Sequence, residues 1–298
     1  LPDAAHVSGT LRFDDAALPT DEKAMARLRG QRIGMVFQEP MTALNPLMRV
    51  GDQIGEAVVL SGQKSDIAAL LTEVGLEAQH ARRFPHQLSG GQRQRVMIAM
   101  ALASAPDLMI ADEPTSALDV ITQRTVLDLI REICDRRQMT LIFISHDMRA
   151  VAALCNRVAV LKAGEPVETG PTEDVLRRPK AAYTQALVAA TQMALRAHHD
   201  LSGQDLLLRV EGVTRAYSRN GVFSRSQPPL LAVHDVSFEV KRGEVLALVG
   251  PSGCGKTTLA RVIAGLDSAT SGTMTIDGTL YHGSDLPREK RGDISLVF

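Results

Sequence analysis

Hydrophobic residues recur along the chain in short runs, and these runs alternate with segments of helical periodicity. The runs IGMVF, LMIAD, LIFIS and EVLALV each hold four or more apolar positions, which is typical of short buried strands. The segment Val120–Arg137 instead places Val126, Ile130 and Ile133 on one face, as an amphipathic helix does. Short strands that alternate with helices predict an α/β fold with a parallel core sheet.

The run EVLALV leads directly into the glycine-rich segment GPSGCGKTTLARVIAGL. This segment fits G-x-x-x-x-G-K-[ST], with Gly250, Gly255, Lys256 and Thr257 at the fixed positions. Glycines let backbone N–H groups turn toward phosphate oxygens, and the following helix adds a partial positive charge at its start. We therefore expect a phosphate loop, with the Lys256 ammonium on the outer phosphates and the Thr257 hydroxyl on Mg²⁺. The loop residues predicted to bind nucleotide are Gly250, Ser252, Gly253, Cys254, Gly255, Lys256, Thr257 and Thr258.

Composition narrows the function classes. The chain has 298 residues, enough for two domains, and its formal net charge of −1 gives no basic excess that would indicate nucleic-acid binding. Its three cysteines form no C-x-x-C pair, which argues against a zinc module or a disulfide framework. No apolar run in the sequence reaches the length of a membrane span.

Two short segments occur twice in the same order. SGTLRFDD begins at Ser8 and SGTMTIDG at Ser271, while RGQRIGMVF ends at Phe37 and RGDISLVF at Phe298. The two members of each pair are about 262 residues apart. This spacing predicts a tandem protein of which the sequence covers slightly more than one repeat. We expect the first copy to lack its phosphate loop in this chain and the second copy to lack its later motifs.

Polar residues that follow the apolar runs carry candidate chemistry. In LSGGQRQR, Ser89 precedes two glycines and a helical run, which fits either an anion site or an ordinary capped helix. In DLMIADEP a strand run ends in Asp112 and Glu113, which fits carboxylates that hold Mg²⁺ and position a water, or two solvated acids. His146 follows LIFIS and Gln38 follows IGMVF, and neither is informative alone.

Taken in order around one repeat, the phosphate loop, Gln38, LSGGQRQR, DEPTSALD and SHD resemble the ATP-binding cassette ATPases. The resemblance implies a P-loop NTPase fold, with a parallel sheet, an antiparallel β region and a helical subdomain between Gln38 and Ser89. It implies ATP and Mg²⁺ as cofactors, with Mg²⁺ held by Thr257, Asp112 and Gln38.

The same resemblance distributes roles over single residues. Glu113 would be the general base, His146 would contact the γ-phosphate, Gln38 would be a catalytic residue whose amide can touch metal or water, and Tyr217 would stack on adenine. Asp119 would belong to an interface loop. The signature that covers ATP bound on an opposite cassette would consist of Ser89, Gly90, Gly91 and Gln92.

Longer stretches resemble one branch of the cassettes. FQEPMTALNPLMRVGDQI is similar to the ATPases of peptide, nickel and glutathione importers. GEPVETGPTEDVLRRPKAAYTQAL resembles their C-terminal extension, although Ala181 and Ala182 stand where His and Pro are usual. SRNGVFSRSQPPLLAVHDVSF resembles the second ATPase of such pairs. We therefore expect the remainder of a first cassette at 1–162, the extension at 163–200 and the N-terminal part of a second cassette at 201–298.

This resemblance implies an ATPase that energises import of peptides or related small solutes, bound peripherally at the cytoplasmic face of the inner membrane. The expected partners are membrane permease subunits and, indirectly, an external solute-binding protein, with no nucleic acid, zinc or iron–sulfur centre. One alternative is a truncated fragment without catalytic competence. Another is a cassette ATPase that acts on DNA or ribosomes, which is less favoured because the sequence shows no zinc module, long coiled coil or basic segment.

We also expect the two parts of the chain to close into one hybrid cassette, because an unpaired edge of an apolar parallel sheet is costly. Residues 245–249 would then lie in one sheet with 108–111, with Lys256 near Asp112. One of the duplicated stretches 1–37 and 265–298 would be displaced.

Overall fold

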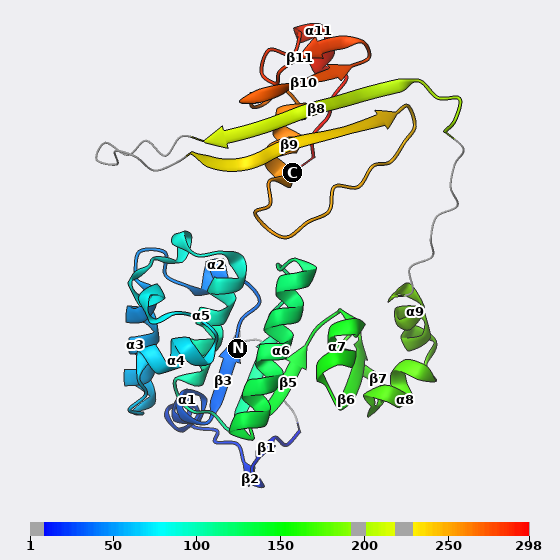
Figure 1. Cartoon of the computed structure of the whole chain (residues 1–298). Helices are drawn as coiled ribbons and strands as arrows, with labels where there is room; N and C mark the ends of the chain where they lie inside the picture. The colour runs from blue at the N-terminus through cyan, green and yellow to red at the C-terminus, as the bar shows by residue number, and fades with distance from the viewer. Residues whose placement is uncertain (1–8, 192–200, 218–228, 298) are drawn as a thin grey trace. The chain divides into compact units, whose positions relative to one another are not determined.

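The computed structural model describes residues 9–191, 201–217 and 229–297 and divides into two compact units, 1–193 and 194–298 (Figure 1). The segment 218–228, part of the stretch that resembles a second ATPase, lies outside the described residues.

A three-stranded parallel sheet forms the centre of the first unit, in the order β3–β4–β5. Its strands are β3 (Ile33–Val36), β4 (Leu108–Asp112) and β5 (Thr140–Ile144). The register aligns Val36 with Ala111 and Ala111 with Phe143, so alternate residues of all three strands share one face. That face is buried in the main core, while Ile142 on the opposite face is 48% exposed.

Two long helices supply the other side of this core. α5 (Gly90–Leu102) and α6 (Val120–Arg137) bury mainly aliphatic side chains, and α6 has the bounds and the buried stripe predicted from its periodicity. The helix α6 begins at an N-cap aspartate and ends at Gln138, whose left-handed backbone closes the last turn. The parallel sheet and its helices confirm the expected α/β fold.

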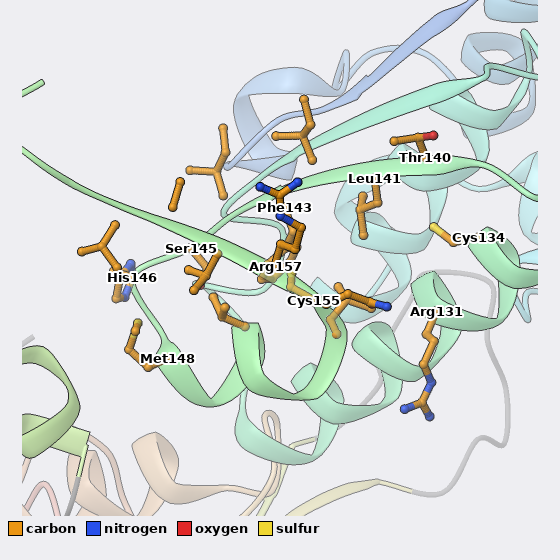
Figure 2. A pocket seen from close by; sticks show the side chains of 18 of the residues that line it. Arg131, Cys134, Thr140, Leu141, Phe143, Ser145, His146, Met148, Cys155 and Arg157 are labelled. Carbon is orange, nitrogen blue, oxygen red and sulfur yellow. The ribbon is translucent and has the colours of Figure 1, made fainter. Parts of the chain in front are cut away.

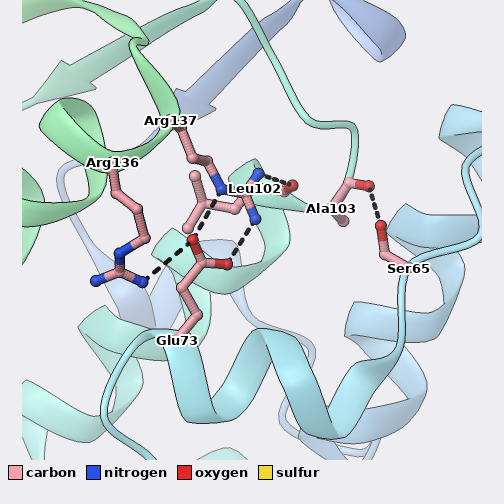
Figure 3. Close-up of polar contacts among 6 residues, drawn as sticks. All are labelled: Ser65, Glu73, Leu102, Ala103, Arg136 and Arg137. Carbon is pink, nitrogen blue, oxygen red and sulfur yellow. Dashed lines mark hydrogen bonds and ion pairs between the residues drawn. The ribbon is translucent and has the colours of Figure 1, made fainter.

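The predicted helical subdomain between Gln38 and Ser89 is present. It consists of α2 (Pro40–Ala43), α3 (Val50–Ser61), α4 (Ile67–Glu73) and the 3₁₀ turns η1 (Ala78–Arg82) and η2 (Pro85–Gln87). Figure 3 shows how it is tied to the core: the Glu73 carboxylate accepts two hydrogen bonds from the Arg137 guanidinium, at 2.8 and 2.5 Å. A third nitrogen of Arg137 donates to the carbonyl of Leu102 at the end of α5.

Smaller elements complete the first unit. Before the sheet come β1 (Arg12–Phe13), β2 (Ala16–Ala17) and α1 (Glu22–Gln31). After it come α7 (Met148–Leu154), β6 (Arg157–Lys162), β7 (Glu165–Pro171), α8 (Thr172–Arg177) and α9 (Ala182–Thr191). β6 and β7 pair as an antiparallel ribbon.

The second unit is built on an antiparallel sheet in the order β11–β10–β8–β9. Its strands are β8 (Leu206–Tyr217), β9 (Leu230–Lys241), β10 (Ser271–Ile276) and β11 (Thr279–Tyr281). The helix α10 (Lys256–Ile263) packs Leu259 and Val262 into the core of this unit, and the short helix α11 (Arg288–Arg291) follows β11. This sheet is the antiparallel β region predicted from the resemblance.

The first repeated segment forms a hairpin in both units, whereas the second forms strand β3 in the first unit and no strand at 294–297 in the second. In the first unit β1 and β2 pair around Asp14 and Asp15, and in the second unit β10 and β11 pair around Asp277 and Gly278. All four turn residues have positive φ, between 47° and 77°, as two-residue hairpin turns of the primed type require. Both copies of the first segment therefore form a two-residue turn of the same type.

The predicted strand in EVLALV is also wrong. Residues 245–249 have no strand conformation, and Val245 and Val249 are 82% and 91% exposed. The physical reason is that a strand exists only through hydrogen bonds to a neighbouring strand, and none of the described sheets pairs with this segment. The expected hybrid sheet of 245–249 with 108–111 is therefore not formed.

Candidate functional site at the strand ends and the phosphate loop

Three of the predicted catalytic residues meet at the carboxyl ends of the parallel strands. Gln38 follows β3, Glu113 follows β4 and His146 follows β5. The Gln38 amide donates to one oxygen of the Glu113 carboxylate at 3.0 Å, and His146 Nδ1 lies 2.9 Å from the other oxygen. Parallel strands place their carboxyl ends at one sheet edge, so residues 75 and 33 positions apart in sequence become neighbours.

The backbone of Glu113 has a left-handed conformation that non-glycine residues rarely adopt, with φ of 43°. Its N–H donates to the carbonyl of Ile144 on β5 at 2.9 Å, which carries the sheet pairing one residue past the end of β4. Such conformations cost about 1–3 kcal/mol and persist where the surroundings fix them. The strained turn directs the carboxylate of Glu113 toward Gln38 and His146.

The Glu113 carboxylate changes the acidity of its histidine partner. Its hydrogen bond and its negative charge raise the pKa of His146 above the ordinary value of 6.5. The His146 side chain is 74% exposed and the Glu113 side chain 24%, so the carboxylate is the better shielded of the two. A shielded carboxylate at a strand end is suited to accept a proton from water.

The start of α5 has the capped geometry that its sequence allowed. Ser89 is the N-cap: its hydroxyl accepts from the N–H of Gln92 at 3.3 Å, and the Gln92 side chain accepts from the N–H of Ser89 at 3.0 Å. The amide nitrogen of Gln92 also lies 3.3 Å from Nε2 of His80. This reciprocal cap fixes Ser89, Gly90 and Gly91 at the positive end of a 13-residue helix.

Gly91 is required by the contact between α5 and α6. A Cβ atom at this position would lie 2.4 Å from Cγ2 of Thr122 in the first turn of α6. Thr122 cannot easily turn away, because its N–H and its hydroxyl both donate to the carboxylate of Asp119, at 3.1 and 2.8 Å. Asp119, predicted to belong to an interface loop, thus caps α6 and holds Thr122 beside Gly91.

In the second unit the phosphate loop has the conformation that its glycines permit. Gly253 and Gly255 have φ of 80° and 99°. The Lys256 ammonium donates to the carbonyls of Gly250 and Pro251 at 2.7 and 2.8 Å, so it lies within its own loop. The helix α10 starts at Lys256, which puts Thr257 and Thr258 in its first turn.

The loop lies against the strand β9. A Cβ atom on Gly255 would come within 2.1 Å of the carbonyl oxygen of Ala232 and 3.3 Å of Val233. Val233 pairs with Arg215 on β8, two residues before Tyr217. The predicted adenine-stacking residue therefore ends the strand that neighbours the one packed on the phosphate loop.

A cavity of about 1050 Å³ lies beside the sheet of the first unit, between β5 and the segment that forms α7 and β6 (Figure 2). In the described part of the chain, this edge of β5 has no strand neighbour, and apolar side chains such as Phe143 line it. Burial, with a smaller effect of Asp135, raises the pKa of Cys134 to about 11, and burial raises the pKa of Cys155. Both thiols are protonated at neutral pH, which makes them poor nucleophiles and metal ligands.

Residues that could hold a metal ion are few. Asp112 ends β4 directly before Glu113, and the amide nitrogen of Gln38 donates to Glu113, so only the carbonyl oxygen of Gln38 could serve a metal ion. Within 9–191, 201–217 and 229–297, no group of three His, Cys, Asp or Glu side chains could hold a metal ion. No described helix combines the length and the apolar character that a membrane crossing needs.

Sequence reasoning missed two polar residues beside Tyr217. The Tyr217 hydroxyl donates to Asp267 at 2.7 Å, and the Arg215 guanidinium lies 4.5 Å from the centre of the Tyr217 ring. Partial burial opposes ionisation of Asp267, but hydrogen bonds from Tyr217 and Ser268 and the charge of Arg215 outweigh it and lower its pKa. No local pattern indicates this cluster, because Asp267 lies 50 residues from Tyr217.

The parallel sheet with polar residues at its strand ends and the phosphate loop that opens α10 define a P-loop nucleotide-binding protein of the cassette type. The family model described as "ABC transporter" matches residues 3–116 and 233–298, more than half of the chain. The chain therefore belongs to the ABC transporter family.

Curated relatives are also ATP-binding proteins of import or transport systems. The chain is 41% identical over 312 residues to the glutathione import ATP-binding protein GsiA of Salmonella choleraesuis, which covers 92% of this chain and 50% of that protein. It is 37% identical over 311 residues to the peptidoglycan transport ATP-binding protein YejF of Agrobacterium fabrum, covering 100% of this chain and 56% of that protein. The chain spans about half the length of the curated relatives it matches.

Solved structures give the same fold. One is the dimeric, post-hydrolysis state of the ATP-binding cassette MJ0796 bound to ADP and Pi, with a TM-score of 0.50 and 28% identity over 55% of this chain and 74% of that one. Another is cbiO1 from Clostridium perfringens, part of the ABC transporter complex cbiONQ, with a TM-score of 0.51 and 30% identity over 57% of this chain and 69% of that one.

Proposed function

We propose that the native polypeptide carrying this sequence binds and hydrolyses ATP to drive import of a peptide or a related small solute. The observation that carries the proposal is the group Gln38, Glu113 and His146 at the strand ends, in a chain that also folds a phosphate loop at the start of α10. The alternatives of DNA or ribosome action have no feature in the described residues that favours them.

Each residue has a chemical task in this proposal. Glu113 accepts a proton from the attacking water, His146 donates to the γ-phosphate, and Gln38 orients the carboxylate and the water. Lys256 and the N–H groups of its loop neutralise phosphate charge.

Mg²⁺ fits the oxygen donors that the two units offer. Thr257 contributes a hydroxyl in the second unit, and Asp112 and Gln38 contribute a carboxylate and an amide oxygen in the first. Mg²⁺ prefers such ligands together with phosphate oxygens and water, and it would supply charge neutralisation at the phosphates of each nucleotide.

The chain would join parts of two cassettes: the remainder of one at 1–162, an extension at 163–200 and the first part of another at 201–298. Support comes from the first repeated segment, which forms the same type of hairpin turn in both units. In this arrangement, Ser89 to Gln92 are the signature of the first cassette, and Asp119 lies in its interface loop.

The proposed importer role also implies partners and a location. The GsiA and YejF relatives are named for glutathione import and peptidoglycan transport, which supports a peptide-like solute. The ATPase would bind permease subunits peripherally at the cytoplasmic face of the inner membrane, with an external binding protein delivering the solute.

The test compares two variants of the native polypeptide that contains this chain. Glu113→Gln should bind ATP normally but hydrolyse it slower by about 10²-fold or more, because proton acceptance from water is lost. Lys256→Ala should weaken ATP binding at its own loop instead. Hydrolysis at the wild-type rate by the Glu113→Gln variant would remove Glu113 from the role of base.

A further inference from the structure

The unit that holds the phosphate loop also contains a cluster of three side chains at the end of β8. Tyr217 is the last residue of this strand. The Asp267 carboxylate accepts the hydroxyl proton of Tyr217 at 2.7 Å and is also paired with Arg215, with nitrogen–oxygen distances of 2.6 and 3.2 Å. The side chains of Arg215 and Asp267 are only 22% and 20% exposed, so water screens this pair less than a surface pair.

Arg215 also lies over the aromatic ring of Tyr217. The guanidinium of Arg215 lies 4.5 Å from the ring centre, within cation–π distance, and so covers one face. An aromatic ring can stack a nucleobase on its second face, and such stacking tolerates any base because every base has a π face.

Asp267 connects this ring to the phosphate loop through one helix. It follows α10, and its N–H donates to the carbonyl of Arg261 in the last turn, while Lys256 starts the same helix. The adjoining turn also holds the end of β8, because Thr270 accepts from the N–H of Ala216 and donates to the carbonyl of Thr214. The ring and the loop are therefore held by the same rigid element.

We propose that Asp267 and Arg215 are positioning residues that fix the Tyr217 ring for stacking on the base of a nucleotide whose phosphates occupy the loop. The proposal rests on the proposed ATP site and adds to it the residues that determine how much the base contributes to binding. Asp267 fixes the ring through its hydroxyl, and Arg215 covers the face that the base does not use. Without them the ring must be immobilised when the base binds, and that ordering weakens affinity.

The test measures binding of ATP and of inorganic tripolyphosphate, each with Mg²⁺, to the native polypeptide that contains this chain, by isothermal titration calorimetry. Tripolyphosphate occupies the loop but has no base. Asp267→Asn and Tyr217→Phe should each weaken ATP binding about 3- to 10-fold, the fold-change expected when one flexible side chain must be ordered. Both variants should bind tripolyphosphate within about twofold of the wild type, and Tyr217→Ala should weaken ATP binding at least as much.

Asp267→Glu is the matched control, because it keeps a carboxylate and should recover part of the ATP affinity. Equal weakening of ATP and tripolyphosphate by Asp267→Asn would show a structural role at the end of α10 and overturn the proposal. Wild-type ATP affinity in that variant would overturn it as well. A wild-type native polypeptide that binds neither ligand would refute the proposed function itself, and the positioning role with it.

Discussion

The contact between Gly91 and Thr122 gives the sharpest stability prediction. Alanine at position 91 would bring a Cβ atom within 2.4 Å of Thr122 Cγ2, whereas carbon atoms pack best at about 3.5–4.0 Å. Thr122 is held by two hydrogen bonds to Asp119, so relief requires either loss of the α6 cap or a shift of the two helices. Overpacking of this kind costs about 1–3 kcal/mol.

Alanine also favours a helix over glycine by up to about 1 kcal/mol, which would mask part of the clash. A double-mutant cycle removes this effect. Thr122→Ser deletes the clashing methyl group but keeps the hydroxyl that bonds Asp119. Gly91→Ala should therefore be less destabilising in the Thr122→Ser background than in the wild type by about 1–3 kcal/mol.

The free energy of unfolding is measured by urea denaturation followed by circular dichroism at the helix band. This signal reports mainly the first unit, because it contains all the described α-helices except α10 and α11. Gly90→Ala is the control: its Cβ would lie 3.6 Å from Leu118, an ordinary contact, so it should show no coupling to Thr122→Ser. A coupling energy below about 0.5 kcal/mol for Gly91→Ala would refute the reasoning, since independent sites add within that range.

Three further predictions concern other contacts. Glu73→Gln should destabilise the first unit by about 2–3 kcal/mol in the same denaturation assay, because it leaves the largely shielded guanidinium of Arg137 without its charge partner. A loss of stability below about 0.5 kcal/mol would contradict this expectation. The pKa of His146, measured by NMR, should lie above 6.5 in the wild type and should be lower in Glu113→Gln. Because the folded pKa is raised, the stabilisation from this pair is complete below pH 6.5 and is lost as the pH rises through the raised pKa. Gly255→Ala should abolish tripolyphosphate binding, since the added Cβ would overlap the backbone of β9 and the position has φ of 99°; unchanged calorimetric binding would count against the loop geometry.

Several features of this protein follow from local sequence alone. The bounds of α6, the cap of α5 at Ser89 and the helix after the phosphate loop all appear where the pattern predicts them. These elements are determined by neighbours within four residues, through hydrophobic period, capping side chains and glycine backbone freedom. The motif order likewise indicates the family, because each motif is short and contiguous.

Other features depend on the tertiary structure. The run EVLALV has the composition of a buried strand, yet a strand needs a partner strand, and in the described residues none is paired with it. The meeting of Gln38, Glu113 and His146 depends on parallel pairing of three strands far apart in sequence. The bonds of Tyr217 to Asp267 and the approach of Gly91 to Thr122 depend on packing between elements, which no local pattern encodes. Local sequence therefore determined the helices and their caps, whereas long-range pairing and packing decided which strands formed and which side chains met.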